Sequence, residues 1–212
     1  MPFKRLFVAS FLALAGLAAL TGAAAAETFR IVALGDSLMA GYQLGPGESF
    51  PEKLETALKA KGHDVVIVNA GVSGDTSSGG LARLDWSVPD DTDLVILGLG
   101  ANDMLRGISP EITARNLEEM IARLKGRGID VLLAGMLAAP NLGEAFASDF
   151  NGIYPRLAKE HGLTLYPFLL DGVAAQRGML LEDGMHPNPA GVDRMVEGVV
   201  PLVEQKLARG QG

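Results

Sequence analysis

Short apolar runs recur along the chain, and each is followed by a glycine or a polar residue. Five of these runs are predicted to be strands: 29–34, 65–68, 94–97, 129–134 and 163–167. The first three end at Gly35, Asn69 and Gly98. Continuous apolar runs of this length are typical of parallel strands that are covered on both faces. The pattern therefore predicts a buried parallel sheet.

Amphipathic segments separate the apolar runs. Ser49 and Glu52 form a capping box before one helical pattern, and Ser109 followed by Pro110 opens another. Further helices are expected around 150–161 and 190–207. Strand and helix alternate throughout, which predicts a doubly wound α/β fold with three layers, α/β/α.

The first 26 residues have a different pattern. Lys4 and Arg5 precede an apolar run, and small residues ending in Ala26 follow it. This order is typical of a secretory signal peptide that is cleaved after Ala26, although the apolar run also approaches the length of a membrane anchor. We expect residues 1–26 to be a signal peptide, residues 27–212 to be one domain, and the mature chain to be periplasmic or secreted, without stable insertion into a membrane.

Charge and cysteine content narrow the possible functions. Without its first 26 residues the chain has 16 basic and 25 acidic residues, a formal charge of −9. A chain this acidic is not expected to bind nucleic acid. It contains no cysteine, so a thiol nucleophile and a thiolate metal site are excluded. We expect no metal and no cofactor, and a monomer that acts on a small-molecule substrate.

Polar residues follow the first three predicted strands. Ser37 follows the first, a glycine-rich turn containing Gly74 follows the second, and Asn102 follows the third. Because parallel strands bring their carboxyl ends to one edge, these groups should converge there. A hydroxyl, a bare backbone turn and a carboxamide suit acyl transfer, which needs a nucleophile and hydrogen-bond donors for an oxyanion.

The base that acyl transfer requires is expected among three histidines. His63 lies in a turn between helix and strand, and His161 lies at a helix end before Gly162. His186 instead lies in a turn-rich loop, three residues after Asp183. A carboxylate at this spacing can accept a hydrogen bond from one ring nitrogen while the other faces Ser37. An isolated pair of this kind is also compatible with an ordinary surface loop.

The chain resembles the GDSL, or SGNH, hydrolases, and within them the periplasmic thioesterase I, lysophospholipase L1 and arylesterase group. The resemblance extends from about Ile31 to Val199. It is carried by these stretches, in order: IVALGDSLMAGY, VIVNAGVSGDTSSGGLARL, LGLGANDMLRG, EAFASDFNGIYPRLAKEHGL and EDGMHPN. It implies a flavodoxin-like five-stranded parallel sheet and a serine esterase that hydrolyses acyl esters and thioesters.

The resemblance also implies a role for each matching residue. Ser37 would be the nucleophile, with Asp183 and His186 completing a triad. The oxyanion would be held by the backbone N–H groups of Ser37 and Gly74 and by the side-chain amide of Asn102. Gly71 competes for the role of Gly74, but the S-G-D-T context matches Gly74.

Apolar residues after the third-strand motif and in the 136–141 loop are candidates for contact with an acyl chain. These substrate-binding candidates are Met104, Leu105 and Leu137. The apolar stretch at Met104 is short, so we expect a shallow groove that suits short to medium acyl chains.

Other motifs in the chain indicate other functions less specifically. Gly98 and Gly100 suggest a dinucleotide fingerprint, but its sixth position is Asp103 instead of glycine. Asp90, Asp91 and Asp93 suggest a Ca²⁺ site, although a solvated turn is the favoured interpretation. A carbohydrate acetyl-esterase of the same superfamily and a non-catalytic exported binding protein remain as alternatives.

Overall fold

The computed structural model describes residues 27–210, and the predicted signal peptide lies outside the described residues. Its centre is a sheet of five parallel strands, in the order β2-β1-β3-β4-β5. The strands are β1 (Phe29–Gly35), β2 (Val65–Gly71), β3 (Leu94–Gly98), β4 (Asp130–Ala134) and β5 (Thr164–Tyr166). This is the flavodoxin-like strand order. β2 is added on one side of β1, and β3, β4 and β5 are added on the other side. The predicted sheet is confirmed.

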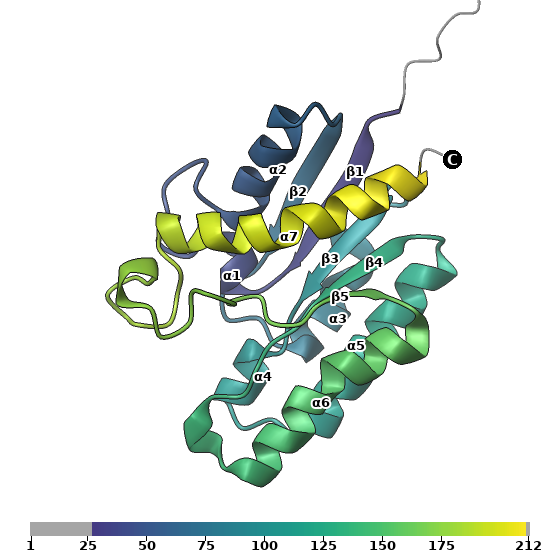
Figure 1. Ribbon diagram of the computed structural model, residues 1–212. Coiled ribbons are helices and arrows are strands. Elements are labelled where there is room, and N and C mark those ends of the chain that lie inside the picture. The colour runs from purple at the N-terminus through teal and green to yellow at the C-terminus, as the bar shows by residue number, and fades with distance from the viewer. Residues whose placement is uncertain (1–26, 211–212) are drawn as a thin grey trace, which may run out of the picture.

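Helices cover both faces of the sheet. They are α1 (Ser37–Ala40), α2 (Phe50–Ala60), α3 (Ser77–Ser87), α4 (Ala101–Leu105), α5 (Pro110–Gly126), α6 (Glu144–His161) and α7 (Pro189–Gly210), with the 3₁₀ turns η1 (Pro140–Leu142) and η2 (Arg177–Met179). α2 and α7 pack together on one face, and α3, α5 and α6 lie on the other (Figure 1). The three-layer α/β/α architecture is therefore confirmed.

The core follows from this double covering. All five residues of β3 are buried, as are the last five of β1. The edge strand β2 differs, since Ile67 is 8% exposed while its neighbour Val68 is 44% exposed. Only one face of β2 is thus fully covered. At Ile67 and Val68 a buried residue is followed by an exposed one, whereas consecutive residues of the central strands are buried on both faces.

Some element boundaries differ from the sequence prediction. α6 begins at Glu144 instead of near Phe150, directly after Gly143, whose φ of +84° suits glycine. The whole of α3 was not predicted, because the segment that opens it is rich in serine and glycine. The short helices α1 and α4 were not predicted either.

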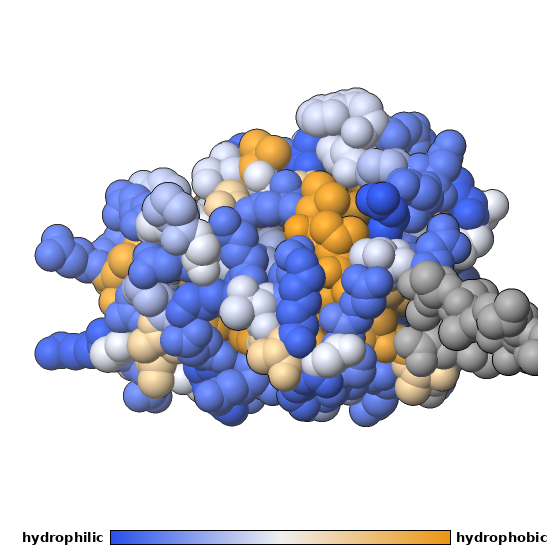
Figure 2. Space-filling view, turned by 90° about the horizontal axis from the view of Figure 1, so that it is seen from above, coloured by the Kyte–Doolittle hydropathy of each residue, from blue (hydrophilic) through white to orange (hydrophobic). Residues whose placement is uncertain are grey.

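The surface is mostly polar. Figure 2, which views the molecule from the top of Figure 1, shows a largely hydrophilic face crossed by a narrow apolar stripe. Within residues 27–210, no helix has both the length and the apolar character needed to cross a bilayer.

Candidate active site

Ser37 lies at the end of β1, where the chain turns sharply into α1. Asp36 is the N-cap residue of α1, and its Oδ1 accepts a hydrogen bond from the Leu38 N–H at 3.0 Å. This cap satisfies a backbone donor that a helix start otherwise leaves unpaired. Ser37 is therefore the first residue of a short helix at the carboxyl edge of the sheet, the edge at which ligands bind in such folds.

The structure brings Ser37 together with His186 and Asp183. The Nε2 atom of His186 lies 2.9 Å from the Oγ of Ser37, and its Nδ1 atom lies 2.6 Å from the Oδ2 of Asp183. His186 is on the loop between β5 and α7, which Figure 1 shows beside α1. The three side chains are joined by two hydrogen bonds, from the Asp183 carboxylate to the His186 imidazole and from the imidazole to the Ser37 hydroxyl.

The carboxylate of Asp183 is held in its ionised form. Its Oδ1 accepts hydrogen bonds from the backbone N–H groups of His186 and Met185, at 3.0 and 2.9 Å. These two bonds, followed by the bond to the His186 ring, lower the pKa of Asp183 to about 2. Asp183 therefore carries a negative charge beside the imidazole throughout the neutral pH range.

Backbone hydrogen bonds fix the loop that carries His186. The His186 carbonyl accepts from the Leu181 N–H at 2.8 Å, and the Asn188 N–H donates to the Met179 carbonyl at 2.9 Å. The Asn188 side chain adds a bond to the Gly178 carbonyl at 3.0 Å. The loop closes on itself, so the position of His186 does not depend on helix packing alone.

Two backbone donors near Ser37 are free. Neither the Ser37 N–H nor the Gly74 N–H has a hydrogen-bond acceptor within residues 27–210. Gly74 has a φ of +82°, a conformation that strongly favours glycine. The chain changes direction at this residue, in the loop after β2. Unpaired N–H groups at such a site are available to an oxyanion.

The side-chain amide of Asn102 lies against the same loop. Its Nδ2 donates to the backbone carbonyl of Asp75 at 3.0 Å and lies 3.4 Å from the Oδ2 of Asp36. Asn102 thus contacts both the residue after Gly74 and the residue before Ser37. The three predicted oxyanion residues come from the ends of β1, β2 and β3 and are linked through these contacts.

Gly71, the competitor for the role of Gly74, has a packing explanation. A Cβ atom at position 71 would overlap the backbone of Met39 and Ala40. Glycine at this position lets the end of β2 approach α1 closely. No donor role is needed to account for it.

Two acidic residues beside the site serve other purposes. Asp36 is buried, and burial, only partly offset by the Leu38 N–H bond, raises its pKa to about 6. Asp103 is also buried and accepts hydrogen bonds from the N–H and hydroxyl of Ser77 at 2.7 and 2.5 Å. Asp103 therefore holds the start of α3.

The three predicted acyl-contact residues differ in exposure. Leu105 is 59% exposed and Leu137 is 43% exposed, but Met104 is only 7% exposed. The sulfur of Met104 lies 3.2 Å from the Ala139 N–H, beneath the 136–141 loop. Met104 therefore offers a substrate little surface and supports the loop from below.

The remaining histidines and the acidic cluster have structural partners. His63 pairs with Glu204 at 3.1 Å, and His161 lies in the last turn of α6. Asp90 pairs with Arg127 and Asp91 with Arg30, while Asp93 accepts a hydrogen bond from the backbone N–H of Arg30 at 2.7 Å. Each of the three acids before β3 thus has a structural partner. Among residues 27–210, no group of three or more His, Asp or Glu side chains is placed to hold a metal ion.

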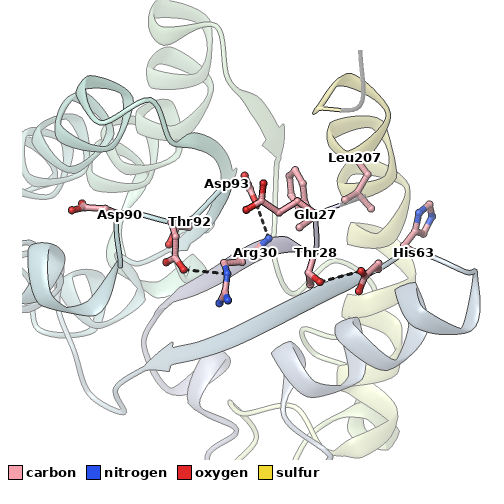
Figure 3. Close-up of a pocket in the computed structure, with 11 residues that line it drawn as sticks. Glu27, Thr28, Arg30, His63, Asp90, Thr92, Asp93 and Leu207 are labelled. Atoms are coloured by element: carbon pink, nitrogen blue, oxygen red, sulfur yellow. Dashed lines mark hydrogen bonds and ion pairs between the residues drawn. The ribbon is translucent and has the colours of Figure 1, made fainter. Parts of the chain in front are cut away.

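A hollow of about 640 Å³ lies at the other end of the sheet. Figure 3 shows Thr28 and Arg30 in it, near the start of β1. Their polar groups are already paired, since Thr28 bonds Asp64 at 3.0 Å and Arg30 pairs with Asp91 at 3.1 Å. The hollow is remote from Ser37, and its chemistry is that of a paired, charged surface.

Two residues near the site were not singled out from the sequence. Tyr42 lies against the His186 ring, and Arg83 forms a buried ion pair with Asp75 at 2.6 Å. Both lie inside stretches that carry the family resemblance. A lone arginine between Leu81 and Leu84 has the spacing of an ordinary helix residue, so the sequence carries no signal that Arg83 is buried.

Comparisons with known proteins identify the family of the chain. Residues 33–194 match the GDSL-like Lipase/Acylhydrolase family. The arylesterase of Vibrio mimicus is 40% identical over 88% of this chain and 92% of its own. The Escherichia coli protein named thioesterase 1/protease 1/lysophospholipase L1 is 37% identical over 85% of this chain and 87% of its own length.

A solved structure shows the same likeness. The crystal structure of AlinE4, described as an SGNH-hydrolase family esterase, aligns with a TM-score of 0.72 and 45% identity. The alignment covers 85% of this chain and 97% of AlinE4.

Proposed function

The chain belongs to the GDSL-like Lipase/Acylhydrolase family and is a carboxylic ester hydrolase of the serine esterase type, and from this premise we propose that Ser37, His186 and Asp183 are its catalytic triad. One observation carries the proposal. The Ser37 Oγ lies 2.9 Å from the His186 Nε2, whose ring is bonded through Nδ1 to Asp183. Nucleophile, base and orienting carboxylate are thus within hydrogen-bond reach of one another.

In the acylation step, the Ser37 Oγ attacks the carbonyl carbon of the substrate while the His186 Nε2 takes the hydroxyl proton. Asp183, ionised at neutral pH, accepts from Nδ1 and stabilises the imidazolium that forms. The imidazolium then gives its proton to the leaving alcohol or thiol. An acyl group remains on Ser37, and a water molecule activated by His186 releases it as a carboxylic acid.

The negative oxygen of the tetrahedral intermediate is held by three donors. The free N–H groups of Ser37 and Gly74 supply two of them, and the Asn102 amide supplies the third. Asn102 keeps its 3.0 Å bond to the Asp75 carbonyl, while the longer 3.4 Å contact to Asp36 is exchanged for the oxyanion. The donors are in place before the charge develops, which is the condition for effective stabilisation.

The substrates are acyl esters and thioesters. The names of the relatives, arylesterase and thioesterase 1/protease 1/lysophospholipase L1, support this range. Leu105 and Leu137 are exposed apolar side chains that can contact the acyl chain, whereas the nearly buried Met104 supports the 136–141 loop. Because each buried methylene contributes about 0.8 kcal/mol only while it is covered, short to medium chains are preferred over long ones.

The mature protein is periplasmic or secreted and monomeric. The order of basic, apolar and small residues in the first 26 positions supports export and cleavage after Ala26. Mass spectrometry of the exported protein would test this, since a chain that begins at Glu27 is expected. A retained Met1 would contradict it.

The test of the function is a panel of p-nitrophenyl esters with acyl chains of about 2 to 16 carbons, together with acyl-CoAs. We expect kcat/KM to peak at short or medium chains and to fall below detection in Ser37→Ala. Activity confined to acetyl esters would favour a carbohydrate acetyl-esterase. Binding of the esters without turnover would favour a binding protein.

A further inference from the structure

A buried arginine lies behind the loops that carry the oxyanion donors. Arg83, on α3, is 7% exposed. Its Nε donates to the Asp75 Oδ2 at 2.6 Å, and its two terminal nitrogens donate to the carbonyls of Ala70 and Gly35 at 2.9 Å each. Gly35 ends β1, and Ala70 is the second-last residue of β2. One side chain therefore joins the ends of two strands to the loop that follows β2.

Asp75 extends this connection to Asn102. Its side chain is held by Arg83, and its backbone carbonyl accepts the Asn102 amide at 3.0 Å. Gly74, with its free N–H, directly precedes Asp75. Any displacement of Asp75 would therefore move two of the three oxyanion donors.

The α3 helix leaves room for the Asp75 carboxylate. A Cβ atom at Gly79 would overlap the Asp75 Oδ1. α3 thus contacts Asp75 in two ways, through the Arg83 guanidinium and through the bare backbone of Gly79. The first turn of α3 is also tied to α4, the helix of Asn102, by the Ser77 bonds to Asp103.

Stability alone does not account for this ion pair. The cost of removing both charges from water offsets most of the attraction between them, so a buried pair contributes little net stability. A guanidinium, however, has donors in a rigid planar fork that can fix several acceptors at once. Oxyanion stabilisation depends on donor placement, and an error of about 1 Å can cost ~10²-fold in rate.

We propose that Arg83 is a positioning residue for the oxyanion hole, which acts through Asp75 on Asn102 and Gly74. The proposal rests on the function assigned above to Asn102. It identifies α3 as the element that sets the distance between the donor loop and the nucleophile.

The experiment is a double-mutant cycle between Arg83 and Asn102, with kcat and KM measured for a p-nitrophenyl ester. Arg83→Lys keeps the charge but loses the fork, so we expect kcat to fall by about 10-fold with KM within about 2-fold. In the Asn102→Ala background the same substitution should change kcat by less than about 3-fold, because one of the two donors that Arg83 positions is already absent and only Gly74 remains.

Gly79→Ala is a second variant for the same cycle. Alanine favours the helix but displaces the Asp75 carboxylate, so kcat should again fall in a way that depends on Asn102.

Two matched controls test for general effects. Lys206→Arg alters a buried cation paired with Asp130 at 2.7 Å at the far end of the sheet, and Gly152→Ala lies in open space on α6. Both controls should keep wild-type kcat.

The outcomes separate the two proposals. If Asn102→Ala itself leaves kcat unchanged, the proposed oxyanion hole is wrong. If Asn102→Ala lowers kcat but Arg83→Lys and Gly79→Ala do not, or lower it equally in both backgrounds, Arg83 is a structural residue and the inference is overturned.

Discussion

The ring of Tyr42 lies against the imidazole of His186, with ring centroids 4.4 Å apart and an interplanar angle of 36°. His186 is already bonded at both nitrogens, to Ser37 and to Asp183. The Tyr42 ring covers one face of the imidazole and so opposes its rotation away from Ser37. Tyr42 is itself 38% exposed.

Loss of this ring should weaken catalysis moderately. An aromatic pair contributes about 0.5–1.5 kcal/mol beyond its buried area, so Tyr42→Ala is expected to lower kcat by about 2- to 12-fold. Tyr42→Phe keeps the ring and should retain wild-type kcat. Steady-state kinetics with a short-chain ester check both. Equal losses in the two variants would mean that the hydroxyl, and not the ring, is important.

Asn102→Ala should lower kcat by ~10²–10³, the usual effect of removing one oxyanion donor. Asn102→Asp has nearly the same volume but replaces the donor with an acceptor, so its loss should be at least as large. Thermal unfolding of both variants serves as the control for folding. A variant with wild-type kcat would show that the amide only links Asp75 and Asp36.

Activity should rise with pH, because only neutral imidazole at His186 can take the Ser37 proton. Asp183, with its pKa lowered to about 2, stays ionised over this range and adds no limb of its own above about pH 4. Asp183→Asn should lower kcat at every pH, including the plateau. A pH–rate profile of both kcat and kcat/KM tests this, and a kcat plateau unaffected in Asp183→Asn would remove Asp183 from the triad.

Ionisation of the buried Asp36 should lower the free energy of unfolding as pH rises. Its folded pKa, raised to about 6, lies above the ordinary value of 3.8, so the folded state binds the proton more tightly than the unfolded state does. The stability present below about pH 4 is therefore lost as pH rises through about 6. Asp36→Asn keeps an acceptor for the Leu38 N–H and should be more stable than the wild type at pH 7.5, by up to about 3 kcal/mol.

Urea unfolding at pH 4 and pH 7.5 checks the Asp36 prediction. The advantage of Asp36→Asn should be small at pH 4, where the folded wild type is also neutral at this position. An equal difference at the two pH values would mean that the substitution acts through packing and not through the charge.

Much of the fold follows from local sequence signals. The Ser49 and Glu52 capping box is present where it was expected, and the strands begin within one residue of their predicted starts. The signals fail where a helix lacks a regular apolar stripe. α3 opens with serines and glycines because its surface receives the Asp75 carboxylate and the side chain of Leu99, a requirement that comes from tertiary contacts.

The site was also predictable only in part, because local sequence signals do not report tertiary contacts. Ser37, Gly74 and Asn102 follow strand ends, so the parallel sheet alone places them on one edge. The contact of His186 with Ser37 spans 149 positions and follows from no local spacing. Arg83 and Tyr42 have ordinary spacing within their segments, and only the folded chain shows that one is buried against four acceptors and the other lies on His186.

The most direct test of the account is covalent labelling of the nucleophile. The protein is treated with a fluorophosphonate, and the modified peptide is identified by mass spectrometry. We expect one adduct, on Ser37, that is absent in Ser37→Ala and forms much more slowly in His186→Ala, since the hydroxyl then lacks its base. Labelling that persists unchanged in Ser37→Ala would contradict the assignment of Ser37 as the nucleophile.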